Sequence, residues 1–298
     1  MHHKPRVAIL GVTGFIGSGL PELFAAEGIA TTGISRAGGG FVRGVDRWQK
    51  ADALDFTGHD AVINLAGESI ARRWTSENKR LFHESRVTVT RRIVAAIRAL
   101  PEGARPRVLV NTSAVGIYGD GGDHVLTESS LPGSGYLADL CREWEEAALE
   151  AESLGVRVVR LRIGVVLGRD GEAFRKLKRV FKLGIGGRLG SGRQWMPWIH
   201  NDDLRNAILH SVNSTALTGA VNATAPVAER NADFTRKFAA ALHRPAIFPV
   251  PGFALKLALG GFGSALLEGQ NAKPAALEAD GFRFLYPTLE SALAALVD

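Results

Sequence analysis

Cysteine is almost absent from the sequence, since Cys141 is the only one in 298 residues. A single cysteine cannot close an intrachain disulfide, which favours a cytoplasmic protein over a secreted one. The histidines show no i, i+4 pairing, so we expect no metal site. No apolar run reaches the roughly 18 residues that a spanning helix needs, and a strand pattern begins too early for a signal peptide. We therefore expect no membrane partner.

Acidic residues are the minority among the charged residues, and the net charge is +6 with a pI near 9.7. The densest basic run, Arg175 to Lys182, contains Leu177, Val180 and Phe181 at helical spacing. This pattern predicts the solvated face of a helix more than a nucleic-acid patch. We expect no nucleic-acid partner, whereas an anionic small ligand would suit a basic protein.

Apolar runs of strand length alternate with longer amphipathic stretches. The expected strands are VAILG (7–11), IATTGIS (29–35), AVINLAG (61–67), RVLVNTS (107–113) and VRVVRLRIG (156–164). The expected helices cover about 15–27, 76–100 and 135–154. This alternation predicts an α/β protein with a Rossmann-type, doubly wound parallel sheet that helices cover on both faces.

The alternation loosens after about Gly168. The later segments that we expect to be ordered are helices near 201–213 and 231–243, a strand at 220–224, and IFPVPG at 247–252. They indicate a smaller α+β substrate lobe.

The domain prediction follows from this change of pattern. We expect an NADP-binding Rossmann domain over 1–168, which also takes in elements at about 201–224. The C-terminal lobe would cover 169–298, including a tail from about 248 to 298.

Three glycines lie between the first predicted strand and helix. Gly11, Gly14 and Gly17 have the spacing G-x-x-G-x-x-G. The first glycine permits a sharp turn, the second a close approach of the backbone to a pyrophosphate, and the third close packing of the helix on the sheet. The pattern predicts a dinucleotide site, and the alternative is a tight turn without a ligand.

The end of the second strand indicates which dinucleotide is bound. Ser35 and Arg36 stand where an NAD-binding chain has Asp or Glu. A hydroxyl and a guanidinium suit the 2′-phosphate of NADP, so we expect NADP(H) rather than NAD. The alternative for Arg36 is an ordinary exposed loop residue.

Small residues at the end of the AVINLAG strand leave room for a ligand in the crevice of the sheet. The strand ends with Leu65, Ala66 and Gly67, of which the last two are small, and Glu68 follows directly. Glu68 either contacts a ribose hydroxyl or caps the next segment.

Several motifs together resemble the extended, sugar-nucleotide-epimerase-like form of the short-chain dehydrogenase/reductase superfamily. They are GVTGFIG (11–17), NLAG (64–67), NTSAVGIYGD (111–120), RLRIGVVLG (160–168) and WIHNDDL (198–204). Four longer stretches are similar to its atypical YfcH-like branch, the epimerase family proteins. They are residues 64–90, 141–148, 190–200 and 266–293.

The resemblance implies an NADP(H) cofactor. The residues that we expect to contact it are Gly11, Thr13, Gly14, Phe15, Ile16, Gly17, Ser35, Arg36, Leu65, Ala66, Gly67, Glu68 and Arg86. Arg86 lies in one of the family-specific stretches, and its alternative is a solvated charge.

The resemblance also implies a catalytic pair, in which Ser113 polarises a carbonyl and Tyr136 transfers the proton. In the superfamily a Lys four residues after the Tyr lowers the Tyr pKa, but here that position holds Leu140. Without a nearby cation a phenol stays protonated at neutral pH, which damages an oxidation more than a reduction. Ser113 has the alternative of a turn residue, and we expect Cys141 to pack rather than react.

The segment GSGRQWMPWIH is the candidate substrate wall, with Gln194, Trp195, Trp198 and His200. The alternative is that its tryptophans fix the C-terminal lobe to the sheet. Taken together, we expect an NADP(H)-dependent oxidoreductase or epimerase-like enzyme for a small carbonyl or alcohol, with nucleotide sugars among the candidates. The alternatives are an NADPH-binding regulator without turnover, acting through a protein partner, and a sugar-nucleotide epimerase proper. A homodimer is a further candidate, because the superfamily often forms one.

Overall fold

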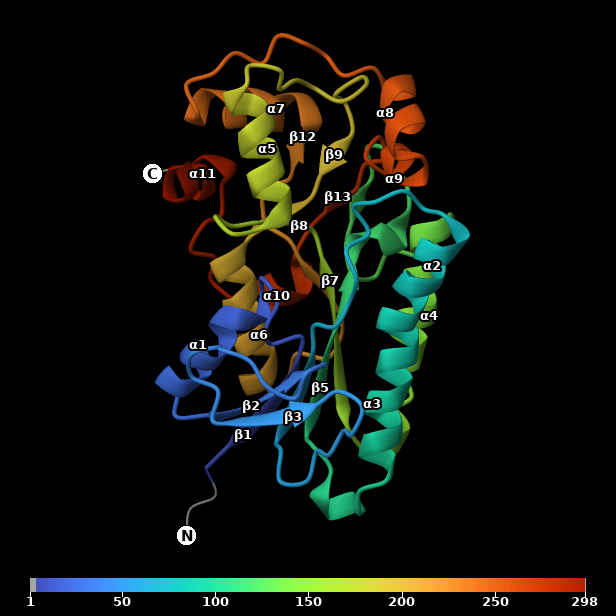
Figure 1. Cartoon of the computed structure of the whole chain (residues 1–298), viewed down its shortest axis with the longest axis vertical. Coiled ribbons are helices and arrows are strands. Elements are labelled where there is room, and N and C mark those ends of the chain that lie inside the picture. Colours follow the sequence, from blue (N-terminus) through green and yellow to red (C-terminus); the bar gives the residue numbers. More distant parts are fainter. Residues whose placement is uncertain (1–3, 298) are drawn as a thin grey trace.

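One parallel sheet of seven strands forms the centre of the protein, whose residues 4–297 are described by a computed structural model (Figure 1). The strands are β1 (Arg6–Leu10), β2 (Ala30–Ser35), β3 (Arg47–Lys50), β4 (Ala61–Asn64), β5 (Val108–Ala114), β7 (Arg157–Ile163) and β11 (Gly219–Ala223). Their spatial order is β11-β7-β5-β4-β1-β2-β3, and every pair is parallel. The predicted Rossmann-type sheet is confirmed. Its order reverses between β1 and β4, where such sheets bind their ligands.

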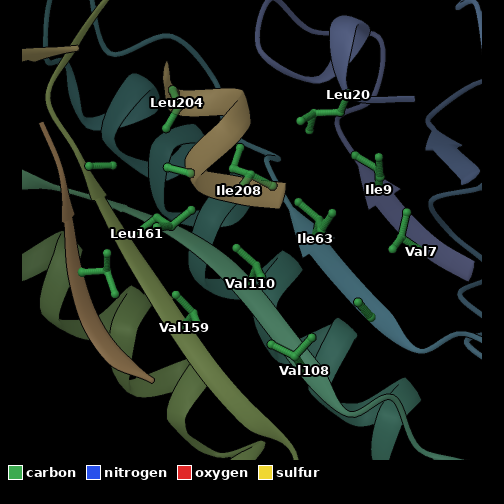
Figure 2. Packing of buried hydrophobic residues seen from close by; sticks show 14 of the residues in the cluster. Val7, Ile9, Leu20, Ile63, Val108, Val110, Val159, Leu161, Leu204 and Ile208 are labelled. Carbon is green, nitrogen blue, oxygen red and sulfur yellow. The ribbon is translucent and has the colours of Figure 1, made fainter. Parts of the chain in front are cut away.

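Helices cover both faces of the sheet, as expected for strands that are buried on both sides. Helices α1 (Leu20–Ala26) and α6 (Asn201–Asn213) cover one face, and α3 (Val89–Arg98) and α4 (Tyr136–Leu149) the other. Figure 2 shows the first core, where these residues meet: Val7, Ile9, Leu20, Ile63, Val108, Val110, Val159, Leu161, Leu204 and Ile208. The β-branched residues in the strands have stiff side chains that suit a pleated surface.

The helix predicted over 76–100 is present but is not uniform. It consists of α2 (Ser76–His83), a π-helical turn (Glu84–Thr88) and α3. The side chain of Thr75 caps its start by accepting a hydrogen bond from the amide of Asn78. A π turn adds a residue to the helical repeat and changes the direction of the following side chains, often at functional sites.

Three local expectations differ from the structure. The helix expected from residue 15 begins at Leu20, after a 3₁₀ turn over Gly17–Gly19, because glycine disfavours the helix and Pro21 suits its first turn. Strand β3 was not expected, because RWQK has no apolar alternation and lies at the sheet edge. IFPVPG is a loop in which only Val250 forms a bridge, to Leu189.

The C-terminal lobe has its own core, in which Phe174, Phe181, Phe234, Phe238 and Trp198 are buried. Its helices are α5 (Glu172–Lys182), α7 (Asn231–Ala241), α8 (Gly252–Leu259), α9 (Gly261–Ala265), α10 (Ala275–Ala279) and α11 (Leu289–Val297). Its short strands are β8 (Val165–Leu167), β9 (Trp195–Met196), β10 (Trp198–His200) and β12 (Glu229–Arg230). The lobe alternates along the chain with α6 and β11 of the main sheet. The domain boundaries stay a prediction.

The tail returns to the sheet. Strand β13 (Asn271–Ala272) pairs with β6 (Val125–Leu126), and α10 packs against β11. The buried carboxylate of Asp203 on α6 accepts hydrogen bonds from the amides of Leu285 and Tyr286, at 2.7 and 3.0 Å. The tail is therefore fixed to the Rossmann domain as well as to the lobe.

Two features are absent from residues 4–297. No helix there has the length and apolar character needed to cross a bilayer. No group of three or more His, Cys, Asp or Glu side chains in that range is arranged to hold a metal ion.

Candidate cofactor and active site

The loop between β1 and α1 turns through its three glycines. Gly11 has a φ of +77°, and a Cβ on it would lie 2.9 Å from the carbonyl oxygen of Leu65. A Cβ on Gly17 would overlap the Gly11 carbonyl oxygen, whereas one on Gly14 would approach only that oxygen, at 3.1 Å. Within the described residues, the amides of Phe15 and Ile16 donate no hydrogen bond. The tight turn at Gly11, the open space beside Gly14 and the amides without a hydrogen-bond acceptor suit the binding of a pyrophosphate.

A cleft of about 490 Å³ opens at the carboxyl ends of β1, β2 and β4. Nine of the residues predicted to contact the cofactor line it: Gly11, Thr13, Gly14, Ser35, Arg36, Leu65, Ala66, Gly67 and Glu68. An apolar wall that suits an adenine ring comes from Leu10, Ile34, Ala51, Leu54, Leu81 and Val89. Of the other predicted contacts, Gly17 is buried behind the loop, and the ring of Phe15 lies against Gly168 and Gly171.

The turn after β2 presents Arg36 at the mouth of this cleft. The Ser35 hydroxyl donates to the Gly39 carbonyl at 2.8 Å and accepts from the Gly39 amide at 3.1 Å, so it closes the turn. The Arg36 side chain is 93% exposed and lies 3.4 Å from the Glu68 carboxylate. Glu68 also pairs with Arg72, at 3.6 Å. Arg36 is thus the exposed cation at this turn, and a phosphate would compete with the Glu68 carboxylate for its guanidinium.

Arg205, which the sequence did not single out, supports the glycine loop from behind. Its guanidinium on α6 donates to the carbonyls of Phe15 and Ile16, at 2.9 and 3.0 Å. A Cβ on Gly19 would overlap this guanidinium. The Phe15 carbonyl shares a peptide plane with the Ile16 amide, so its bond to Arg205 holds that amide in one orientation.

A second cavity, of about 250 Å³, adjoins the cleft and shares Leu65, Ala66 and Gly67 with it. Its wall is mostly apolar and includes Ile16, Ile70, Leu137, Leu140, Cys141, Trp144 and Ile163. Ser113 and Arg86 also line it, and Arg86 is the one charged residue among the lining residues. Burial raises the pKa of the Cys141 thiol to about 12, so this thiol is protonated and packs, as predicted.

Arg86 is held in place by the π turn. One guanidinium nitrogen donates to the Glu68 carbonyl at 2.9 Å, and the group lies 5.3 Å from the ring centre of Trp144. Burial lowers the pKa of Arg86, but an Arg remains charged at neutral pH. It forms no ion pair with any carboxylate in the described part of the chain. A half-buried cation without an ion-pair partner is a recognition point for an anionic or strongly polar group.

Ser113 is part of a buried network that the sequence did not reveal. Its hydroxyl donates to the Glu145 carboxylate at 2.7 Å. Arg162 bonds both oxygens of that carboxylate, at 2.8 and 3.0 Å, and Arg160 bonds one at 2.8 Å. Arg162 also donates to the Tyr118 hydroxyl. Charged residues at 160 and 162 inside a strand predicted to be buried were the available signal that a buried carboxylate faces them.

Tyr136 begins α4 but is not among the residues that line the second cavity. Its hydroxyl points to the carbonyl of Lys79 at 3.4 Å, and its ring packs on Trp74. The Lys79 ammonium lies 4.5 Å from the centre of the ring. Burial raises the pKa of Tyr136 in spite of the nearby Arg86, so the phenol is protonated at neutral pH. The hydroxyls of Ser113 and Tyr136 thus have separate hydrogen-bond partners, and their catalytic roles stay a prediction.

Of the four candidate substrate residues, none lines the cavity beside Arg86. Gln194 donates to the carbonyls of Leu189 and Leu266, and Trp195 donates to Asp123. Trp198 is fully buried and bonded to the Val227 carbonyl, which corresponds to the packing alternative.

His200 is also buried and takes part in local structure. Its Nδ1 accepts from the Asp202 amide, and its ring lies 3.9 Å from that of Tyr286. Burial lowers the pKa of His200, so its ring is neutral. It borders a separate cavity behind the glycine loop.

Comparisons with known proteins agree with this geometry. The profile of the NAD dependent epimerase/dehydratase family matches residues 7–223, and that of a domain of unknown function, DUF1731, matches residues 250–296. The epimerase family protein SDR39U1 homolog, chloroplastic, of Arabidopsis thaliana is 39% identical over 98% of this chain and 86% of its own length. An epimerase family protein of Mycobacterium leprae is 37% identical over 97% of this chain and 95% of its own length.

Solved structures are similar over the same extent. Human epimerase family protein SDR39U1 (isoform 2), crystallised with NADPH, is 34% identical with a TM-score of 0.88, covering 98% of this chain and 99% of the human one. A nucleoside-diphosphate sugar epimerase of Corynebacterium glutamicum is 31% identical with a TM-score of 0.79, over 98% of this chain and 58% of the other.

Proposed function

The chain belongs to the NAD dependent epimerase/dehydratase family, and from this premise we propose that it is an NADP(H)-dependent enzyme of the oxidoreductase or epimerase type. The proposed substrate is a small carbonyl or alcohol compound, bound in the cavity beside Arg86. The observation that carries the proposal is the junction of two cavities at Leu65–Gly67. One has the shape and donors for a dinucleotide, and the other ends at a half-buried cation.

The residues that line the cleft suit this cofactor. The amides of Phe15 and Ile16 would hold the pyrophosphate, and Arg36 would meet the 2′-phosphate that distinguishes NADP from NAD. The NADPH bound to the human relative supports NADP(H) over NAD. When bound, the nicotinamide supplies or accepts a hydride.

Arg86 takes the electrostatic role in the proposed reaction. The hydroxyl hydrogen of Ser113 is bonded to Glu145, so it is not available to polarise a substrate carbonyl. The hydroxyl of Tyr136 faces a backbone carbonyl of α2. Arg86 therefore remains as the donor that can stabilise negative charge on the reacting oxygen. Arg86 comes from the π turn between α2 and α3. In the superfamily the corresponding lysine lies on the helix that carries the tyrosine, which is α4 here.

The cofactor part of the proposal is tested by titrating NADPH and NADH into the wild type and the Arg36→Ala variant. We expect the variant to lose about tenfold in NADPH affinity and to keep its NADH affinity, since only NADPH has the 2′-phosphate. Equal losses for the two dinucleotides would contradict the placement of Arg36.

The catalytic part is tested by NADPH oxidation with a panel of aldehydes, ketones and keto-sugars. We expect Arg86→Gln to lower turnover by roughly 100-fold and to change NADPH affinity much less. Arg91→Gln, on the exposed side of α3, is the matched control. An Arg86→Gln variant with wild-type turnover would remove Arg86 from the mechanism.

A second function, NADPH binding without turnover by a regulator that acts through a protein partner, is favoured by one observation. The Ser113 hydroxyl donates its hydrogen to Glu145, and the Tyr136 hydroxyl donates to the Lys79 carbonyl. Tight NADPH binding, with no oxidation by any compound of the panel, would favour this function over the first. The homodimer stays a prediction that light scattering can test.

A further inference from the structure

Two segments of the C-terminal lobe contain no acidic residue. Residues 173–201 and 234–267 have no Asp or Glu, but together they contain eleven Lys and Arg residues. This number exceeds the net charge of the whole chain, +6, so the rest of the chain is net acidic. The positive charge of the protein is therefore concentrated in the lobe.

Most of these cations have no carboxylate partner. Lys176, Arg236 and Lys237 form ion pairs. Within residues 4–297, the others form none: Arg175, Lys178, Arg179, Lys182, Arg188, Arg193, Arg244 and Lys256. Their charge is available to an external anionic surface.

The same two segments expose an unusual amount of apolar side chain. Seven of the twelve large exposed hydrophobic residues within 4–297 belong to them: Val180, Leu183, Ile185, Ile247, Phe248, Phe253 and Leu257. Phe253 and Leu257 on α8 are 75% and 76% exposed. In the sequence of α8, GFALKLAL, only Lys256 is charged, so the helix presents apolar side chains to solvent as well as to the lobe.

The two segments lie side by side. The Gly190 amide donates to the Val250 carbonyl, and the Val250 amide donates to the Arg188 carbonyl, both at 2.8 Å. A groove of about 320 Å³ between the segments is lined by Arg188, Arg236 and Arg244 together with Ile247. In Figure 1 the loop after α5, the loop before α8 and α8 itself form the top edge of the molecule, away from the N-terminus. We call these residues, 175–188 and 244–257, the basic–apolar edge.

We propose that the basic–apolar edge binds the surface of an anionic phospholipid bilayer. The apolar side chains of α8 and the 247–248 loop enter the boundary between headgroups and acyl chains, and the Lys and Arg side chains contact lipid phosphates and carboxylates. No spanning helix is needed for attachment of this kind. The proposal goes beyond the proposed enzymatic function and does not depend on it.

The chemistry of the edge favours a bilayer over other partners. A nucleic acid would pair with the cations but would leave Leu183, Ile247 and Leu257 in water, since such surfaces use stacked aromatic rings. A second copy of the chain would place unpaired cations against each other. An anionic lipid surface satisfies the charges and covers the aliphatic side chains at once.

Vesicle cosedimentation tests the proposal. The full chain is mixed with vesicles of phosphatidylcholine alone or with roughly one-third phosphatidylserine. We expect at least about tenfold tighter binding to the anionic vesicles, decreasing as salt is added. Equal binding to both vesicles, or binding to neither, would overturn the proposal.

Two surface variants locate the contact. Phe253→Ser with Leu257→Ser should weaken anionic-vesicle binding by about tenfold or more, and Arg179→Gln with Lys182→Gln should reduce its dependence on salt. Phe41→Ser is the control, because Phe41 is fully exposed but lies outside the edge. Unchanged vesicle binding in both double variants would show that the edge is not the contact. A wild-type protein that binds a single-stranded oligonucleotide but no vesicles would also contradict the proposal. Melting temperatures verify that each variant is folded.

Discussion

The joined cavities of the site have two ends, the cofactor cleft at the glycine loop and the cavity beside Arg86, and these ends are built from different groups of atoms. At the glycine-loop end, backbone groups form the site, and a short stretch of sequence determines them. At the Arg86 end, side chains from β4, the π turn, β5 and α4 meet, and each depends on the position of the others. The comparison shows that the binding end is a local property of the sequence, whereas the reaction end is a property of the tertiary structure.

The first prediction concerns the buried network at the reaction end and has the largest expected effect. Glu145→Gln leaves Arg160 and Arg162 without a counter-charge in a buried position. We expect a loss of about 3–5 kcal/mol in the free energy of unfolding, measured by chemical denaturation. Glu146→Gln, next in the chain but exposed, should have almost no effect. Similar effects at the two positions would show that Glu145 is not a structural centre of this end.

The second prediction concerns the glycine loop. Gly17→Ala puts a Cβ on the Gly11 carbonyl oxygen, so the loop must shift. We expect NADPH affinity to fall roughly 10- to 100-fold, measured by fluorescence titration. Gly103→Ala, where a Cβ would meet open space, is the control. Unchanged NADPH affinity in Gly17→Ala would show that the backbone geometry of the glycine loop does not determine cofactor binding.

The third prediction uses the Cys141 thiol as a reporter of the reaction end. Its pKa is about 12 in the folded chain against 9.0 ordinarily, so the folded state holds this proton more tightly. Between these pH values the unfolded chain binds fewer protons, and stability falls as the pH rises. The wild type should therefore lose roughly 1 kcal/mol per pH unit above about pH 9 relative to Cys141→Ala. Parallel urea-denaturation curves for the two proteins between pH 8 and about pH 11 measure this difference. Constant differences over the range would mean that the thiol is in contact with water.

The smallest expected effect is that of Tyr136→Phe. The lost hydroxyl has one long hydrogen bond, to the Lys79 carbonyl, and does not border the cavity. We expect NADPH affinity and turnover to change by less than about threefold. A large loss of turnover with unchanged NADPH affinity would show that Tyr136 enters the cavity in the complex, and the contrast between the two ends would then be weaker.

The sequence predicted the sheet and the glycine loop because both depend on short-range patterns. Apolar runs of strand length and strand–helix alternation are visible in short windows of the sequence, and Gly11 is required by a turn between neighbouring elements. The placement of Ser35 and Arg36 at the end of β2 followed from the same local reasoning.

The environment of Arg86, Glu145 and Arg205 could not be predicted in the same way. Each contacts partners that are distant in sequence: Glu145 meets Ser113, and Arg205 meets the carbonyl of Phe15. The π turn that carries Arg86 lies against α4, a contact between segments that are distant in sequence. The motif comparison predicted that Leu140 replaces the lysine of the superfamily. It could not predict that the π turn after α2 brings Arg86 to the same cavity.

The tail can complete the fold only late in the synthesis of the chain. Strand β6 and the carboxylate of Asp203 obtain their partners from residues 271–286, which leave the ribosome after all seven strands of the sheet. Until then the nascent sheet has a carboxylate without its amide donors, which is costly to bury. A chain that stops before residue 271 therefore lacks the partners of β6 and Asp203, even when its glycine loop and sheet are already formed.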